Sequence, residues 1–223
     1  VHLFSYLDQL PPSGHEPSAT SHQPSRTEQF LARQPRVLLV GWSLGGINAL
    51  RLAGQFPKKI AGLVLIAATP RLMEDPATGW HGMSERRLEA LKKGLQMTHG
   101  QGFFGVDPSK PNPYATGEDA DLERGLAFLR ETDCRAGVAN IPQNIPVYLF
   151  QSEKDGIVRS SSVAFIRARL PQTVVRLVPG SEHALPILLP SEIDVAVASI
   201  LGGEAGLANV GGSRKAPGSQ NDL

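Results

Sequence analysis

Short continuous apolar runs recur along the chain and alternate with stretches whose apolar residues have helical spacing. Runs rich in Val, Ile and Leu are typical of strands buried on both faces of a parallel sheet. The predicted strands cover residues 37–40, 60–68, 146–152 and 173–179, with a further short strand at 1–7. The predicted helices cover residues 26–33, 44–56, 160–170 and 191–201. This alternation predicts an α/β fold built on a parallel, doubly wound sheet.

The strand pattern disappears between about residues 70 and 135. Ser84 is a predicted N-cap there, and two sets of leucines at helical spacing follow it: Leu88, Leu91 and Leu95, then Leu122, Leu126 and Leu129. We interpret 70–135 as a helical lid inserted into an α/β core formed by residues 1–69 and 136–201. A disordered tail is expected at 202–223. An ordinary pair of crossover helices joined by a long loop is the alternative to the lid.

Composition excludes several classes of protein. With 223 residues, 41% of them hydrophobic, the chain suits one globular domain, and a net charge of +1 gives no overall attraction for nucleic acid or an anionic membrane. The single cysteine, Cys134, excludes an internal disulfide, and we expect no metal or other cofactor. Since no apolar run approaches the length of a spanning helix and the amino terminus lacks a signal-peptide pattern, we expect a cytoplasmic protein.

A Gly-x-Ser-x-Gly pattern, GWSLG at residues 41–45, lies where the first long apolar strand meets the following helix. The bare pattern is weak, but a buried strand before it and a helix after it are the context of a nucleophile elbow. We therefore predict that Ser43 is a nucleophile, held on a tight turn at the carboxyl end of the sheet.

The residues beside this serine have expected roles in the turn. A side chain at Gly41 or Gly45 is expected to collide as the strand and the helix close on the turn. The N–H of Leu44, at the start of the helix, is the expected first donor of an oxyanion hole, because it points toward developing negative charge.

A serine nucleophile needs a base, and the base needs an orienting acid. In an elbow fold the chain order is Ser, then Asp or Glu, then His, with the acid and the base in loops after late strands. Asp155 and His183 occupy those loops, and we prefer Asp155 to the neighbouring Glu153 and Glu182 because DGIV leaves its strand in a sharp turn. An isolated His or Asp is more often a surface or turn residue, but the ordered context favours a triad.

Several segments resemble the α/β-hydrolases and, within them, the pimeloyl-[acyl-carrier protein] methyl ester esterases of biotin synthesis. They are VGWSLGG at 40–46, GWHGM at 79–83, FLRETDCR at 128–135, DGIV at 155–158 and HALPILLPSE at 183–192. The resemblance implies a serine carboxylesterase in which Ser43 attacks the methyl ester carbonyl, His183 transfers the proton to methanol and Asp155 orients the imidazole.

The same resemblance implies a partner and a binding site. In that family the lid docks an acidic acyl-carrier protein through basic side chains, which here would be Arg86, Arg87, Lys92 and Lys93 of the first lid helix. A solvated helix face is an equally good account of these four residues. The implied oxyanion and substrate-binding residues are Trp42, Leu44, Phe103 and Phe104. The two phenylalanines would line an acyl channel or form the core of the lid.

The chain also departs from the family's pattern. Residues 5–18 resemble the loop after the family's fourth strand, so we expect the N-terminal strands and the His-Gly loop that carries the second oxyanion donor to be absent. Losing one such donor costs about 10²–10³ in rate. Ser152 stands where the family tends to have Gly. A general short-chain esterase and a catalytically silent α/β-hydrolase-like binding protein therefore remain alternatives.

Overall fold

The computed structural model describes residues 26–98, 119–180 and 182–202. Four parallel strands pair in the order β1-β2-β3-β4. They are β1 (Val37–Trp42), β2 (Ile60–Ile66), β3 (Val147–Ser152) and β4 (Thr173–Val178). The four long predicted strands are thus confirmed, with ends that shift by one or two residues. The second strand stops before residue 68 because Ala67 takes a φ of 45°, which leaves the extended region.

Helices connect and follow these strands, as predicted. They are α1 (Arg26–Arg33), α2 (Leu44–Gln55), α3 (Glu85–Thr98), α4 (Asp119–Glu131), α5 (Ser161–Arg169), α6 (Leu185–Leu188) and α7 (Pro190–Leu201). Short 3₁₀ turns add η2 (Pro57–Lys59), η3 (Pro76–Thr78) and η4 (Gly137–Asn140). None of the helices in these described ranges is both long enough and apolar enough to cross a membrane.

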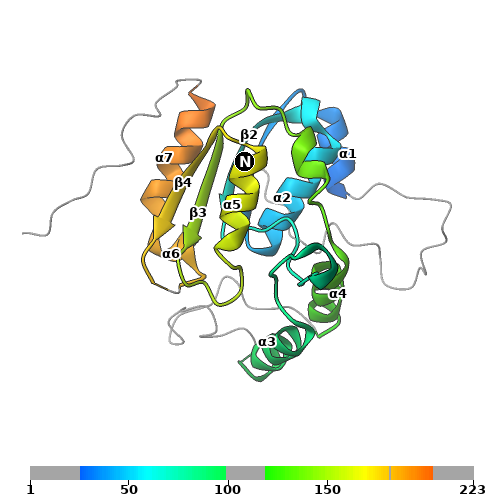
Figure 1. The fold of residues 1–223 in the computed structure, drawn as a ribbon. Coiled ribbons are helices and arrows are strands. Elements are labelled where there is room, and N and C mark those ends of the chain that lie inside the picture. The colour runs from blue at the N-terminus through cyan, green and yellow to red at the C-terminus, as the bar shows by residue number, and fades with distance from the viewer. Residues whose placement is uncertain (1–25, 99–118, 181, 203–223) are drawn as a thin grey trace, which may run out of the picture.

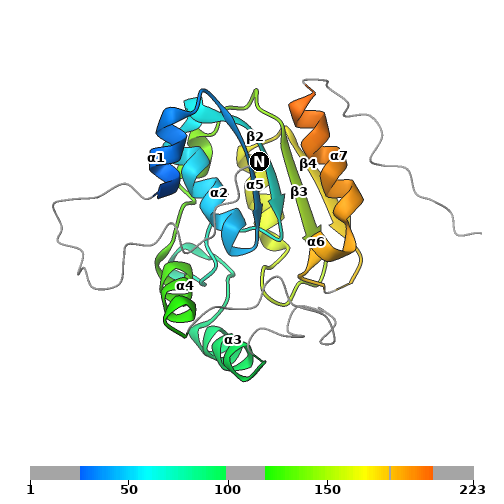
Figure 2. The same cartoon turned by 180° about the vertical axis from the view of Figure 1, so that it is seen from behind.

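Helices cover both faces of the sheet (Figures 1 and 2). Along β2, Leu63 and Leu65 pack with α2 and α5, whereas Val64 and Ile66 pack with α6 and α7, because neighbouring side chains of a strand point to opposite faces. The strand order never reverses, so right-handed crossovers place α2 and α5 on the same face. The structure therefore differs in detail from the predicted doubly wound arrangement. The face of the sheet opposite α2 and α5 is covered by α6 and α7, which follow β4.

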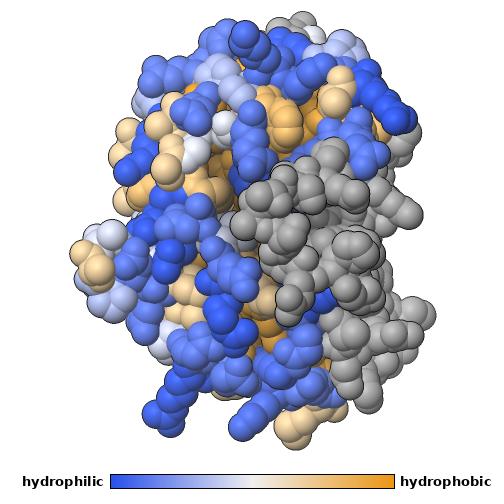
Figure 3. Space-filling model, turned by 90° about the vertical axis from the view of Figure 1, so that its right-hand side faces the viewer, coloured by the Kyte–Doolittle hydropathy of each residue, from blue (hydrophilic) through white to orange (hydrophobic). Residues whose placement is uncertain are grey.

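The segment between β2 and β3 forms a separate helical layer beyond one end of the sheet (Figure 1). Helices α3 and α4 contact each other, and Leu88 and Leu126 are buried in one core cluster, as the leucine spacing predicted. Lys92 also pairs with Glu123 across the two helices, at 2.5 Å. The surface that this layer contributes to the lower part of Figure 3 is mostly hydrophilic.

An ion-pair network holds the two ends of this helical segment together. Arg135 binds Asp133 and Asp75, each at 2.7 Å, and Arg71 binds Asp133 at 2.8 Å. Partial burial raises the pKa of Asp133, but the hydrogen bonds from Arg135 and Arg71 outweigh this effect and lower the pKa to about 2. The loop that leaves β2 is thereby fixed to the end of α4.

Some predictions fall outside the described residues. These are the strand at 1–7, the acyl-channel residues Phe103 and Phe104, and the tail beyond Gly202. The expected absence of the N-terminal strands of the family also stays a prediction, because it concerns residues outside the described ranges.

The β1–α2 turn corrects the expectation for one glycine. A Cβ on Gly41 would lie 2.4 Å from the carbonyl oxygen of Gly45, as expected of a colliding side chain. A Cβ on Gly45, however, would meet nothing within 4 Å. The second close approach is at Gly46, where a Cβ would lie 2.4 Å from the Cβ of Ala68. The motif spacing drew attention to Gly45, but the adjacent glycine is the one that packs on the sheet.

We expect Gly46→Ala to lower the free energy of unfolding by about 1–3 kcal/mol, because the added methyl group overpacks a buried contact. Gly45→Ala is the matched control, and it should leave stability unchanged or raise it by up to about 1 kcal/mol through helix propensity. Urea unfolding of the two variants measures both values. Equal destabilisation by the two substitutions would contradict this account.

We expect Arg135→Met to destabilise the fold by about 1–3 kcal/mol at neutral pH, because it removes the cation that Asp75 and Asp133 share and leaves Asp133 paired with Arg71. Folding lowers the pKa of Asp133 from 3.8 to about 2. The stabilisation from its ion pairs is therefore complete at a pH above the unfolded-state pKa, and it is lost as the pH falls through the folded-state pKa. The difference from the parent protein should thus narrow between pH about 4 and about 2. Arg176→Met, which breaks a more exposed pair, is the control, with a cost of about 1 kcal/mol or less.

Candidate active site

Ser43 occupies the sharp turn between β1 and α2. Its φ of 54° and ψ of −117° are unusual for a residue other than glycine and store about 1–3 kcal/mol of strain. The Ser43 N–H donates to the carbonyl of Ile66 at 2.8 Å, and the Ser43 carbonyl accepts from Gly46 and Ile47. These bonds fix the turn, so that the hydroxyl stands at the carboxyl end of the sheet, where parallel folds place their sites.

The structure brings together the three residues that the sequence predicted as a triad. His183 Nε2 lies 2.8 Å from Ser43 Oγ, and His183 Nδ1 lies 2.8 Å from Asp155 Oδ2. Asp155 follows β3, His183 follows β4, and both are buried, with exposed fractions of 8% and 6%. With the Nδ1 proton on the carboxylate side, Nε2 is the acceptor for the serine hydroxyl. This is the arrangement that nucleophilic acyl transfer requires.

Both carboxylate oxygens of Asp155 accept hydrogen bonds. Its Oδ1 accepts from the backbone N–H groups of Ile157 and Val158 at 2.8 and 3.0 Å. Its Oδ2 accepts from Gln151 Nε2 at 3.3 Å, in addition to the imidazole. Glu153, which was an alternative acid on sequence grounds, is instead exposed to solvent. The carboxylate therefore faces the imidazole in one fixed orientation.

The loop that carries His183 is attached to two other strands, β1 and β3. The indole Nε1 of Trp42 donates to the His183 carbonyl at 2.9 Å, and the hydroxyl of Ser152 donates to the Glu182 carbonyl. Trp42 was predicted among the oxyanion and substrate-binding residues; its indole N–H is engaged by this carbonyl. The other predicted member in the described chain, Leu44, begins α2, where backbone N–H groups have no acceptor within the helix.

Sequence reasoning missed Gln151 and gave Ser152 no role. Both lie at the end of a strand that is otherwise apolar, and both have exposed fractions of 0%. Gln151 Nε2 also donates to the Val158 carbonyl at 3.0 Å, which ties the acid loop to β3. Two polar residues closing a buried apolar strand were the available signal, because most buried polar groups form hydrogen bonds to nearby groups.

The four basic residues predicted to dock a carrier protein do not behave as one set. Arg87 Nη2 donates to the carbonyl of Gly156 in the acid loop at 2.6 Å, and Lys92 is paired within the helical layer. Arg86 and Lys93 are exposed. Two of the four basic side chains of α3 thus bond to other parts of the protein, which leaves fewer cations facing outward than the sequence suggested.

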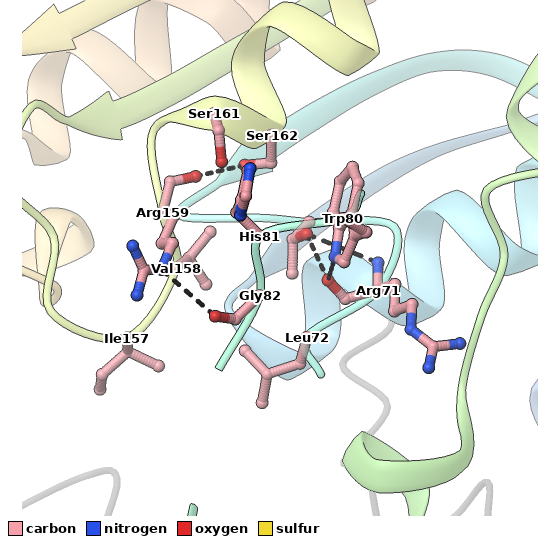
Figure 4. A pocket seen from close by; sticks show the side chains of 11 residues that line it. Arg71, Leu72, Trp80, His81, Gly82, Ile157, Val158, Arg159, Ser161 and Ser162 are labelled. Carbon is pink, nitrogen blue, oxygen red and sulfur yellow. Dashed lines mark hydrogen bonds between the residues drawn. The ribbon is translucent and has the colours of Figure 1, made fainter. Parts of the chain in front are cut away.

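A small crevice lies behind the acid loop, between the loop after β2 and the start of α5 (Figure 4). Arg71, Trp80, His81 and Arg159 are among the residues that line it, whereas Ser43 and His183 are not. Arg159 Nε donates to the Gly82 carbonyl at 3.2 Å across the crevice. The crevice therefore lies where the helical segment meets the acid loop, and it is separate from the serine.

Nowhere in 26–98, 119–180 or 182–202 do three or more His, Cys, Asp or Glu side chains gather as a metal site.

Comparison with known sequences finds esterases among the relatives of this chain. The chain is 28% identical over 199 residues to a pimeloyl-[acyl-carrier protein] methyl ester esterase of Edwardsiella ictaluri, a match that covers 80% of this chain and 75% of the relative. It is 29% identical over 184 residues to the esterase of the same name from Nitrosomonas europaea, covering 74% and 72%. The chain thus spans about three quarters of the length of these curated relatives.

Comparison with solved structures agrees on the fold. A hydrolase from Pseudomonas aeruginosa PA01 superposes with a TM-score of 0.57 at 25% identity, covering 77% of this chain and 66% of that one. A bromoperoxidase from Bacillus anthracis gives 0.62 at 22% identity, covering 78% and 70%, and supports the fold alone. Residues 4–195 match the family described as the alpha/beta hydrolase family. Since this match covers most of the chain, and the sheet and elbow agree with it, the protein belongs to the alpha/beta hydrolase family.

Proposed function

We propose that the protein is a serine carboxylesterase whose catalytic residues are Ser43, His183 and Asp155. The observation that carries the proposal is the continuous hydrogen-bonded chain from Ser43 Oγ through the imidazole to the Asp155 carboxylate, with 2.8 Å at each step. The membership in the alpha/beta hydrolase family and the esterase names of the relatives support the same reaction class.

The proposed reaction has two halves. Ser43 Oγ attacks the ester carbonyl while His183 Nε2 takes its proton, and the oxyanion is stabilised by backbone N–H groups that include that of Leu44. The imidazolium then protonates the departing alcohol, which leaves an acyl-serine. A water molecule, deprotonated by the same nitrogen, then attacks the acyl carbonyl. The bond from the acyl carbon to Ser43 Oγ breaks, the imidazolium returns the proton to Oγ, and the carboxylic acid is released. Asp155 holds the imidazole in the tautomer that both steps require.

We further propose that the substrate is the methyl ester of pimeloyl-acyl-carrier protein, which would place the enzyme in biotin synthesis. The names of the relatives support this substrate. On this proposal residues 70–135 act as a lid, and the exposed cations Arg86 and Lys93 meet the acidic carrier. Arg87 would instead couple the lid to the acid loop through its bond to Gly156.

The reaction class is tested with a fluorophosphonate probe, intact mass and a short-chain ester assay. We expect one adduct on the parent protein and none on Ser43→Ala, with ester hydrolysis lowered by about 10⁴-fold or more in Ser43→Ala and His183→Ala. Asp155→Asn should lower kcat by about 10⁴-fold through the wrong tautomer, whereas Glu153→Gln, an exposed neighbour, should leave it within about two-fold. A folded parent protein that forms no adduct would contradict the esterase and favour a silent binding protein.

The carrier-bound substrate is tested by charge reversal. In the double variant Arg86→Glu, Lys93→Glu we expect KM for the carrier-bound methyl ester to rise about 10-fold, because surface charge mainly governs encounter with a charged partner. KM for a free short-chain ester should stay unchanged. Lys58→Glu, an exposed cation in η2 at the opposite end of β2 from the serine, is the control. Equal activity on free and carrier-bound esters in every variant would favour a general short-chain esterase.

A further inference from the structure

The histidine loop is bound by side chains at two successive backbone carbonyls. Trp42 Nε1 donates to the carbonyl of His183 at 2.9 Å, and Ser152 Oγ donates to the carbonyl of Glu182. Ser152 is fully buried, and the Trp42 ring also lies 5.8 Å, centroid to centroid, from the His183 ring. The peptide groups that determine where the imidazole sits are therefore held from outside the loop.

The two donors come from the strands that carry the other members of the site. Trp42 is the last residue of β1 and immediately precedes Ser43, and Ser152 is the last residue of β3, shortly before Asp155. The side chains that hold the histidine loop are therefore fixed to the same strand ends as Ser43 and Asp155. The sheet thus fixes the positions of the three loops relative to one another.

Strand alternation explains why Ser152 reaches this loop. Tyr148 and Phe150 pack on the face of α6 and α7, and Ser152 continues that row. Gln151 points to the opposite face, toward the acid loop that leads into α5. The last two side chains of β3 therefore attach one loop each.

Backbone bonds also hold the chain just before the histidine loop. Before the loop, the backbone N–H groups of Glu153 and Lys154 donate to the carbonyls of Val178 and Gly180 at 3.0 and 2.9 Å. Gly180 takes a φ of 101°, a conformation that favours glycine. The bonds from Trp42 and Ser152 reach the carbonyls of residues 183 and 182 themselves, so they act on the backbone nearer to the imidazole than these bonds do.

Resting on the proposed function, we propose that Trp42 and Ser152 are positioning residues that hold His183 at reacting distance from Ser43. In this role each acts through the backbone of the histidine loop. A displacement of about 1 Å in a catalytic group costs on the order of 10²-fold in rate. Losing an anchor should therefore appear in kcat and in the reactivity of the serine, with little change in KM.

The test uses Trp42→Phe, Ser152→Ala and the double variant in the full chain. The matched controls are Trp80→Phe, which removes an indole N–H that donates to the Arg71 carbonyl at 3.1 Å, and Thr173→Val, which removes a buried hydroxyl that donates to the Leu170 carbonyl at 2.7 Å. Each control removes the same kind of side-chain to backbone bond, but to a carbonyl outside the three loops that carry the triad. The measurements are kcat and KM on a short-chain ester, the rate of fluorophosphonate labelling, and the free energy of unfolding.

We expect each single variant to lower kcat and the labelling rate by about 10- to 100-fold, with KM within about two-fold, and the double variant to lose more. The controls should keep kcat within about two-fold even where they lose comparable stability. Parent-like kcat in both anchor variants, or an equal loss in the controls, would overturn the positioning roles alone. A folded parent protein that neither labels nor hydrolyses esters would overturn the proposed function, and the positioning roles with it.

Discussion

Helix α2 lies so close to the sheet that a methyl group at Gly41 or Gly46 would overlap a neighbouring backbone or side chain. With hydrogen atoms at these positions, β1 passes directly into α2, and Ser43 is left at the point of the turn with a positive φ. The hydrogen bond to the Ile66 carbonyl and the burial of one face of α2 offset the strain of that conformation. The exposure of the hydroxyl at the end of the sheet follows from this close approach.

The rest of the site depends on the parallel arrangement of the strands. Because β1, β3 and β4 run in the same direction, the loops after them meet at one edge, and residues far apart in sequence come within hydrogen-bonding distance. Polar side chains at the last positions of β3 then fix the acid and histidine loops to opposite faces of the same strand. A buried polar pair in an apolar sheet is stable here because its donors find carbonyl and carboxylate acceptors.

In the part of the chain that the structure describes, the helical segment is attached to the acid loop. Arg87 bonds the Gly156 carbonyl, Arg159 bonds the Gly82 carbonyl, and the network around Arg135 closes the base of the segment. Basic residues in this region therefore serve internal contacts as well as the surface. A count of charges along α3 cannot separate these uses, because an arginine that bonds a distant carbonyl looks the same in sequence as one that faces solvent.

The sequence by itself determined the α/β class, the four long strands, the leucine faces of α3 and α4, and the three residues that meet at the candidate site. Periodicity and chain order are local properties, so burial patterns and the elbow context could be read directly. Only the tertiary structure decided that Gly46 rather than Gly45 packs on the sheet, that Arg87 and Lys92 are engaged internally, and that Gln151, Ser152 and Trp42 hold the loops. Each of these depends on which atoms from distant segments come into contact, and the spacing of residues along one segment carries no information about that.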